Sequence, residues 1–251
     1  MRAHNGSSGQ DRVSAQLYVQ MARMMLTSDD SVTDLMLRID CVGGTVYVHS
    51  HLLTECSEEW KERLQGLYDI DAGLMTLDTT AWRNPEGGKR RWELYIGFVY
   101  GGPIWTRSEE HSLEDDFLQL AIIWDECRYK DQHPDACDAA IDAMCEIVTQ
   151  NADALQNPFG VMLKADTYNE CDDPMRLVLD FMVYGRSENV FGRWYNAAPD
   201  SLASRIDREL AERFEKKGHL RRAQRPMPDL MEPCRYHLHR GSGEHECYLE
   251  L

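Results

Sequence analysis

Residues 32–57 change from a strand-like to a helix-like hydrophobic pattern, and this change constrains the fold more than any other feature of the chain. Apolar and polar side chains alternate over residues 35–40 and again over 45–48, as in strands with one buried face. Between them, Gly43 and Gly44 tolerate positive φ and predict a tight hairpin turn. From His49 onward the apolar residues recur at helical spacing up to Trp60, and Ser57 favours a break or a new helix start there. The sequence therefore predicts a hairpin that leads directly into helix.

Further elements follow in a fixed order. Residues 74–77 predict a short third strand. The elements so far resemble the BTB/POZ domain, and residues 93–102 are similar to the helix of that family that ends in an aromatic-x-Gly turn, here Tyr-Gly-Gly. Residues 117–147 are similar to the paired helices that close the domain, with Pro134 and Asp135 at the break. The intervening stretch 79–91 contains Asn-Pro and Gly-Gly pairs and predicts a polar loop.

This order of elements resembles the BTB/POZ domain, and the match spans roughly residues 32–150. The spacing in 175–181 and the Cys/His-rich end are similar to the BTB-domain proteins of fungi. The resemblance implies an α+β fold, in which short strands accompany a cluster of helices, and a module that binds other proteins. We expect a disordered tail and N-terminal helix in 1–28, the BTB/POZ domain in 29–150, a helical extension in 151–217, and a basic, Cys/His-rich tail in 218–251.

The two flanking regions carry their own helical patterns. Residues 13–26 predict a helix with a methionine-rich apolar stripe, which packs on its own domain or, as the resemblance implies, across a dimer partner. In the extension, apolar residues at helical spacing predict two buried faces. The first face comprises Leu177, Val178, Phe181 and Met182, and the second comprises Leu202, Ile206, Leu210 and Phe214.

Composition narrows the class of protein. The net charge of −16 argues against a general affinity for nucleic acid or anionic membranes, because both are polyanions. No apolar run approaches the length of about 20 residues that a membrane span needs, and the polar start of the chain predicts no secretory signal. We expect an intracellular protein of the cytoplasm or nucleus. Free thiols are the simplest reading of its cysteines, among them Cys41, Cys56, Cys127, Cys137 and Cys145.

Asp34, His49 and the range 67–71 can be compared with functional positions of the BTB/POZ family. Asp34 and His49 match polar positions near the floor of the groove between subunits, and we favour a structural pair over an acid–base pair. Residues 67–71 fall where cullin-binding members carry a hydrophobic-x-Glu motif. The best fits here are Leu67-x-Asp69 and Tyr68-x-Ile70. Both lack the glutamate, which argues against cullin binding, and a cullin scaffold is kept as an alternative partner.

The C-terminal tail carries the clearest chemical cluster. Thiolates and imidazoles are preferred zinc ligands, and 14 residues hold five of them. The predicted ligands of a structural zinc site are Cys234, His237, His239 and Cys247, with His245 as the alternative to Cys234. The competing interpretation is an exposed polar tail. A basic patch over 213–225 has a simple explanation in cations near a helix C-terminus.

The sequence contains none of the motifs G-x-S-x-G, P-loop, G-x-G-x-x-G after a strand, or H-E-x-x-H. We therefore predict a non-catalytic adaptor or scaffold with no catalytic residues, whose expected partners are other proteins, including a second copy of itself in a homodimer. The alternatives are a cullin ubiquitin-ligase substrate adaptor, a chromatin-associated regulator, and a metal-dependent or thiol enzyme built on the C-terminal cluster. Structural zinc is the only cofactor suggested.

Overall fold

The structure is a computed structural model that describes residues 36–65, 75–79, 88–129, 133–165, 173–184, 188–198, 203–204, 207–208, 211 and 236–237. All of them belong to the larger of the two units into which the chain divides, Leu35–Leu251. The described residues include no part of the N-terminal helix predicted for 13–26 and no part of the loop 67–71. They include only isolated positions of the range 202–214, where the second apolar face was predicted.

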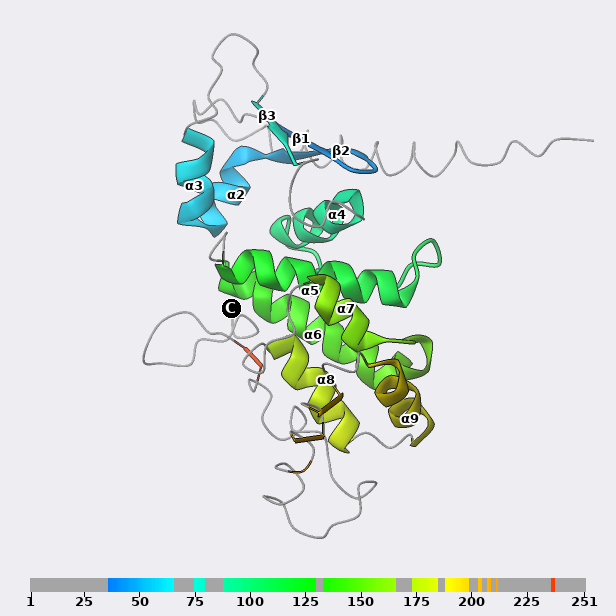
Figure 1. Cartoon of the computed structure of the whole chain (residues 1–251). Helices are drawn as coiled ribbons and strands as arrows, with labels where there is room; N and C mark the ends of the chain where they lie inside the picture. Colours follow the sequence, from blue (N-terminus) through cyan, green and yellow to red (C-terminus); the bar gives the residue numbers. More distant parts are fainter. Residues whose placement is uncertain are drawn as a thin grey trace, which may run out of the picture. The chain divides into compact units, whose positions relative to one another are not determined.

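A three-stranded sheet opens the described part of the chain (Figure 1). β1 (Met36–Cys41) pairs antiparallel with β2 (Gly44–His49) and parallel with β3 (Met75–Asp78), so the strand order is β2-β1-β3. Gly43 and Gly44 have φ angles of 95° and 142°, a region that side chains rarely adopt. The predicted hairpin and third strand are thus confirmed.

The helices next to the sheet follow the predicted change of pattern. α2 (Ser50–Cys56) begins directly after β2, and α3 (Glu58–Gln65) begins after a break at Ser57. α4 (Gly88–Val99) starts five residues earlier than predicted, so the end of the expected polar loop is helical. The reason lies in long-range contacts: the Lys89 N–H donates to the Val42 carbonyl at 3.0 Å, and Arg91 is buried in the first turns of α4.

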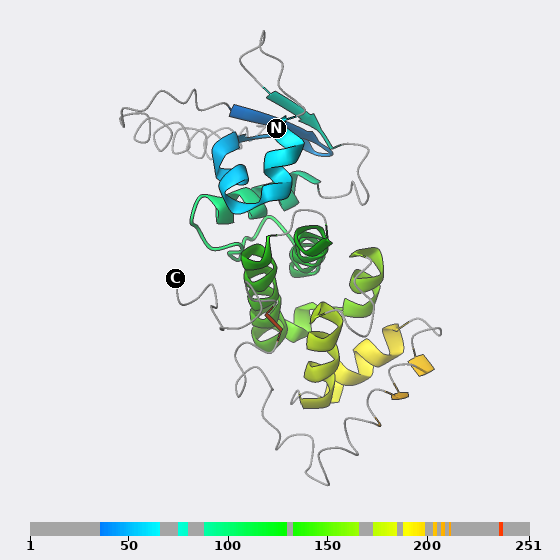
Figure 2. The ribbon, with the colours of Figure 1, turned by 90° about the vertical axis from the view of Figure 1, so that its left-hand side faces the viewer.

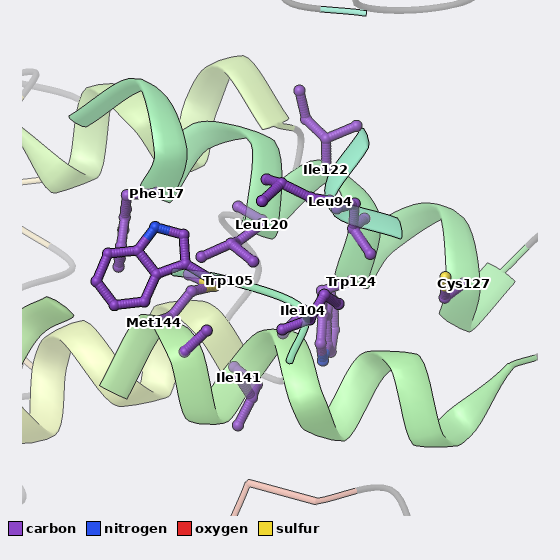
Figure 3. Close-up of a cluster of buried hydrophobic side chains, with 14 of the residues drawn as sticks. Leu94, Ile104, Trp105, Phe117, Leu120, Ile122, Trp124, Cys127, Ile141 and Met144 are labelled. Atoms are coloured by element: carbon purple, nitrogen blue, oxygen red, sulfur yellow. The ribbon is translucent and has the colours of Figure 1, made fainter. Parts of the chain in front are cut away.

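The remaining described helices form the larger, helical part of the fold (Figures 1 and 2). They are α5 (Leu113–Tyr129), α6 (Pro134–Asn151), the short 3₁₀ turn η1 (Ala152–Ala154), α7 (Pro158–Ala165), α8 (Asp173–Tyr184) and α9 (Glu188–Ala197). α5 and α6 pack along each other, α7 packs on α5, and α8 packs on α6. Figure 3 shows large side chains of α5 and α6 at this contact, among them Phe117, Leu120, Trp124, Ile141 and Met144. The α+β class is therefore confirmed, with helices predominating.

The sequence predicts that eight apolar residues are buried together: Leu35, Leu37, Val46, Val48, Leu52, Leu53, Phe98 and Ile122. Leu35 lies outside the described residues, and most of the others are buried. Leu37, Val46, Val48, Leu53 and Ile122 are buried, as are the four residues predicted for the first face of the extension: Leu177, Val178, Phe181 and Met182. Leu52 and Phe98 are only partly buried, and Phe98 packs against the core. α9 lies within the helical extension expected over 151–217, but no helix was predicted at its position. Val190 and Trp194 are buried, and Phe191 and Tyr195 pack against the core while partly buried.

The five described cysteines are free thiols, as predicted. Cys41, Cys127 and Cys137 are buried, whereas Cys56 and Cys145 are partly exposed. Burial raises the pKa of the Cys41 thiol, because the thiolate would lose its hydration.

Candidate functional site

His49 connects the end of the hairpin to the turn after α4. It is the last residue of β2 and immediately precedes α2. Its backbone N–H donates to the Tyr100 hydroxyl at 3.2 Å, and the same hydroxyl lies 2.5 Å from its Nδ1. Asp34, the predicted acidic partner of His49, lies outside the described residues. The observed contacts of His49 are those of a residue that holds β2 against the end of α4.

Asp116 is a fully buried carboxylate that joins three segments. Its Oδ1 accepts a hydrogen bond from Arg90 Nε of α4 at 3.0 Å. Its Oδ2 accepts one from Trp105 Nε1, in the connection between α4 and α5, at 2.8 Å. Asp116 also lies in the first turn of α5, where the helix dipole favours negative charge. These interactions offset the cost of burying the carboxylate and fix α4 and the connection on α5.

A second buried ion pair borders a small cavity between α4 and α5. Arg91 Nε lies 3.5 Å from Glu126 Oε2, and both side chains are almost inaccessible to solvent. The cavity has a volume of about 10 Å³ and is lined by Arg91, Trp92, Tyr95, Ile123, Glu126 and Cys127. The thiol of Cys127, the phenol of Tyr95 and the Arg91–Glu126 ion pair are groups of the kinds that act as nucleophiles, acids or bases in enzymes. A space of this size, however, holds at most about one water molecule, so a substrate does not fit there.

Sequence reasoning missed these buried charges, although one signal for Asp116 was present. Asp116, Leu120, Ile123 and Cys127 recur at helical spacing, which places the carboxylate on the same stripe as three apolar residues. A charged residue on such a stripe either lies at the exposed end of the apolar face or is buried and paired with an opposite charge or a hydrogen-bond donor. Arg90 gave no comparable signal, because its helix was predicted to be a loop at that point.

The outward face of the hairpin carries a polar and aromatic patch, here called the sheet-face patch: Arg38, Asp40, Thr45 and Tyr47. These residues form cross-strand pairs, Arg38 with Tyr47 and Asp40 with Thr45. The side chains that alternate with them point to the opposite face and are buried there. Tyr47 is 52% exposed. Tyrosine and arginine are enriched in protein–protein interfaces, so the sheet-face patch is the candidate binding surface of the hairpin.

Asp40 organises the sheet-face patch. Its Oδ1 accepts hydrogen bonds from Thr45 Oγ1 at 2.8 Å and from Arg38 Nε at 2.9 Å. The Thr45 hydroxyl, followed by the Arg38 guanidinium, lowers the pKa of Asp40 below its ordinary value of 3.8, although partial burial and the nearby Asp78 oppose this effect. The carboxylate therefore stays ionised and holds Arg38 and Thr45 in place beside Tyr47.

Tyr129, at the end of α5, is the other strongly exposed aromatic ring among the described residues. The Arg128 guanidinium lies 5.1 Å from the centre of the Tyr129 ring and 4.8 Å from that of the buried Trp124. This cation–π arrangement stabilises the last turn of α5. Tyr129 thus offers a comparison site for the exposed tyrosine of the hairpin.

Of the predicted zinc ligands, the structure describes His237 alone. Cys234, His239, His245 and Cys247 lie outside the described residues. His237 Nε2 lies 2.9 Å from Asp142 Oδ1 of α6. Within the described ranges, no group of three or more His, Cys, Asp or Glu side chains could hold a metal ion. A carboxylate on one imidazole nitrogen is compatible with a metal on the other, and zinc binding stays a prediction.

Comparisons with models of known protein families, with curated proteins and with solved structures find no match. Among the helices that the structure describes, none is long and apolar enough to cross a membrane. The functional assignment therefore depends on the residues and geometry of this chain.

Proposed function

We propose that this chain is a non-catalytic adaptor or scaffold that acts inside the cell, in the cytoplasm or nucleus, through a BTB/POZ-type domain followed by a helical extension. The observation that carries the proposal is the path of the chain from β1 to α4. An antiparallel hairpin leads into two short helices, and the chain then returns as a third strand parallel to β1 before a longer helix.

This path resembles the order of elements in the BTB/POZ domain, and the paired helices α5 and α6 follow where the family closes its domain. Local sequence supports the same reading, because the turn after α4 contains the aromatic-x-Gly pattern as Tyr100-Gly101-Gly102. Gly101 has a φ of 82°, which explains why glycine occupies this position.

The distribution of polar groups supports a binding role. The charged groups between α4 and α5 are used in buried contacts around a cavity too small for a substrate. The sheet-face patch instead presents an exposed tyrosine, held among fixed polar neighbours, on the outside of the sheet. Such a surface suits recognition of another protein, because an aromatic ring provides contact area at low entropic cost.

The test compares two exposed tyrosines in the full-length protein. Tyr47→Ser alters the sheet-face patch, and Tyr129→Ser is the matched control on α5. Tagged wild-type and variant proteins are expressed in a cell, cross-linked, purified and analysed by quantitative mass spectrometry. We expect the amount of each specific partner recovered with Tyr47→Ser to fall at least tenfold relative to the wild type. Tyr129→Ser should recover the same amounts as the wild type. Equal partner sets for all three proteins, with folding unchanged by circular dichroism, would contradict the assignment of this surface.

A further inference from the structure

Among the strands that the structure describes, β2 lies at one edge of the sheet and pairs with β1 alone. An edge strand leaves every second backbone N–H and C=O without a partner in the ladder. Natural proteins usually protect such an edge with charged residues, proline or a bulge. β2 contains no Asp, Glu, Lys, Arg or Pro, and its register with β1 is continuous. The outer edge of β2 is therefore an unprotected template for a further strand.

The register shows which backbone groups of β2 point outward. Cys41 and Gly44 enclose a two-residue turn and form the first, hydrogen-bonded pair of the hairpin. Hydrogen-bonded and non-hydrogen-bonded pairs alternate along an antiparallel ladder, so Thr45 and Tyr47 belong to pairs of the second kind. The backbone N–H and C=O groups of these two residues therefore point away from β1.

Two observed hydrogen bonds agree with this assignment, because both involve residues of non-hydrogen-bonded pairs. The Asp40 carbonyl turns away from β2 and accepts a hydrogen bond from the Thr79 N–H at 2.8 Å. The His49 N–H turns away from β1 and donates to the Tyr100 hydroxyl at 3.2 Å. The hydroxyl of Tyr100 thus occupies the outer edge of β2 at its last residue.

The outward backbone groups of Thr45 and Tyr47 form no hydrogen bond with any residue that the structure describes. Each residue offers one donor and one acceptor, and the two sets are two residues apart along an extended strand. An extended peptide presents its own N–H and C=O groups at the same spacing, whereas a helix uses these groups internally. The chemistry of this edge therefore suits the backbone of an extended segment.

The surroundings of the edge also define the side chains that such a segment should carry. The charged groups beside the hairpin occur as pairs of opposite sign, Arg38 with Asp40 at 2.9 Å and Lys89 with Glu93 at 3.5 Å. No unbalanced charge among them favours a charged segment. The exposed ring of Tyr47 instead favours a β-branched or aromatic residue opposite to it, as in other cross-strand pairs.

We propose that the partner protein adds an uncharged, extended segment to the outer edge of β2, with its backbone bonded to Thr45 and Tyr47 and a β-branched or aromatic side chain beside the Tyr47 ring. This inference rests on the proposed function, because it gives the way in which the partner reaches the sheet-face patch. A partner that binds through side chains alone would need Tyr47 but would not need the outward N–H of Thr45. The two ideas can therefore be tested separately.

The test removes one outward N–H and leaves Tyr47 in place. Thr45→Pro removes this N–H at an edge position where proline is tolerated. Thr45→Val is the matched control, because it removes the same hydroxyl contact with Asp40 but keeps the N–H. Full-length wild type, both variants and Tyr47→Ser are cross-linked in the cell and compared by quantitative mass spectrometry, with folding checked by circular dichroism.

We expect the recovery of specific partners to be about fivefold or more lower with Thr45→Pro than with Thr45→Val, because a backbone hydrogen bond is lost. Equal recovery with these two variants, together with a loss for Tyr47→Ser, would overturn strand addition and leave the proposed function standing. Equal recovery with all four proteins would overturn both. If light scattering finds a dimeric wild type and a monomeric Thr45→Pro variant, a second copy occupies the edge, which contradicts a partner protein as the occupant.

A second measurement does not depend on the folding of the proline variant. A phage-displayed library of random peptides is selected on wild-type protein, with counter-selection against Tyr47→Ser, and one binder is synthesised with each of its amides N-methylated in turn. Addition to an edge strand predicts a period of two: methylation of every second amide should weaken binding about fivefold or more, and methylation of the intervening amides should not. A pattern without this period, or no saturable binder after counter-selection, would refute the proposal.

Discussion

Replacing Asp116 with alanine should destabilise the protein by about 3 kcal/mol. Breaking a buried ion pair by removing one partner costs about 3–5 kcal/mol, because the remaining charge is left uncompensated. The Arg90 side chain is 16% exposed, so water can partly hydrate its charge after Asp116 is removed. The loss of this ion pair should therefore cost about 3 kcal/mol or less. Loss of the acceptor for the Trp105 indole N–H adds about 1 kcal/mol or more.

Urea unfolding of the full-length protein at pH 7, followed by circular dichroism, measures this change. With a slope of about 3 kcal/mol per molar urea, the midpoint should fall by about 1 M. The control is Asp115→Ala in the same turn of α5, where the side chain is only partly buried and the expected change is below about 1 kcal/mol. If the two variants lose equal stability, the argument from the buried carboxylate is wrong.

Three further predictions concern the hairpin and the two ends of the chain. Thr45→Val should raise the pKa of Asp40 toward 3.8, as measured by carboxyl NMR titration. In the wild type, the lowered pKa implies stability that is present above the unfolded pKa and lost as pH falls through the folded value. Deleting residues 1–28 should lower the oligomer mass in light scattering if the methionine-rich helix crosses a dimer, whereas a wild type that is monomeric at micromolar concentration excludes this role. Elemental analysis of protein purified without chelator should find about one zinc per chain. A variant with both Cys247→Ser and His237→Ala should lose this metal. Wild-type protein without zinc would contradict the zinc site and favour the interpretation of a polar tail.

The elements that could be predicted are those encoded by local spacing. The hairpin, the break at Ser57 and the α6 start at Pro134 all depend on residues within a few positions of each other. Alternation with a period of two and recurrence at helical spacing reflect burial of one face of a strand or helix. These patterns can be recognised in the sequence even when the surface that covers the face is unknown.

The start of α4 and the contact of Tyr236 with Asp180 could not be predicted in this way. α4 begins where Lys89 meets Val42, almost 50 residues away in the sequence. Tyr236 and Asp180 are 56 residues apart, and His237 and Asp142 are 95 apart. In each case the decisive partner lies on another element, and nothing in the local pattern identifies it. His237 was predicted as a zinc ligand, whereas no contact was predicted for the neighbouring Tyr236.

We infer that the buried carboxylates favour one arrangement of helices over others of similar hydrophobic content. Apolar packing is non-directional and tolerates alternative helix contacts. A buried carboxylate does not, because a misplaced partner leaves it without a donor at a cost of several kcal/mol. Asp116 requires the indole of Trp105 and the guanidinium of Arg90, whereas Asp180 accepts the phenol of Tyr236. The first set fixes α4 and its connection on α5. The contact of Tyr236 with Asp180, together with that of His237 with Asp142, joins a tail segment far away in the sequence to α8 and α6.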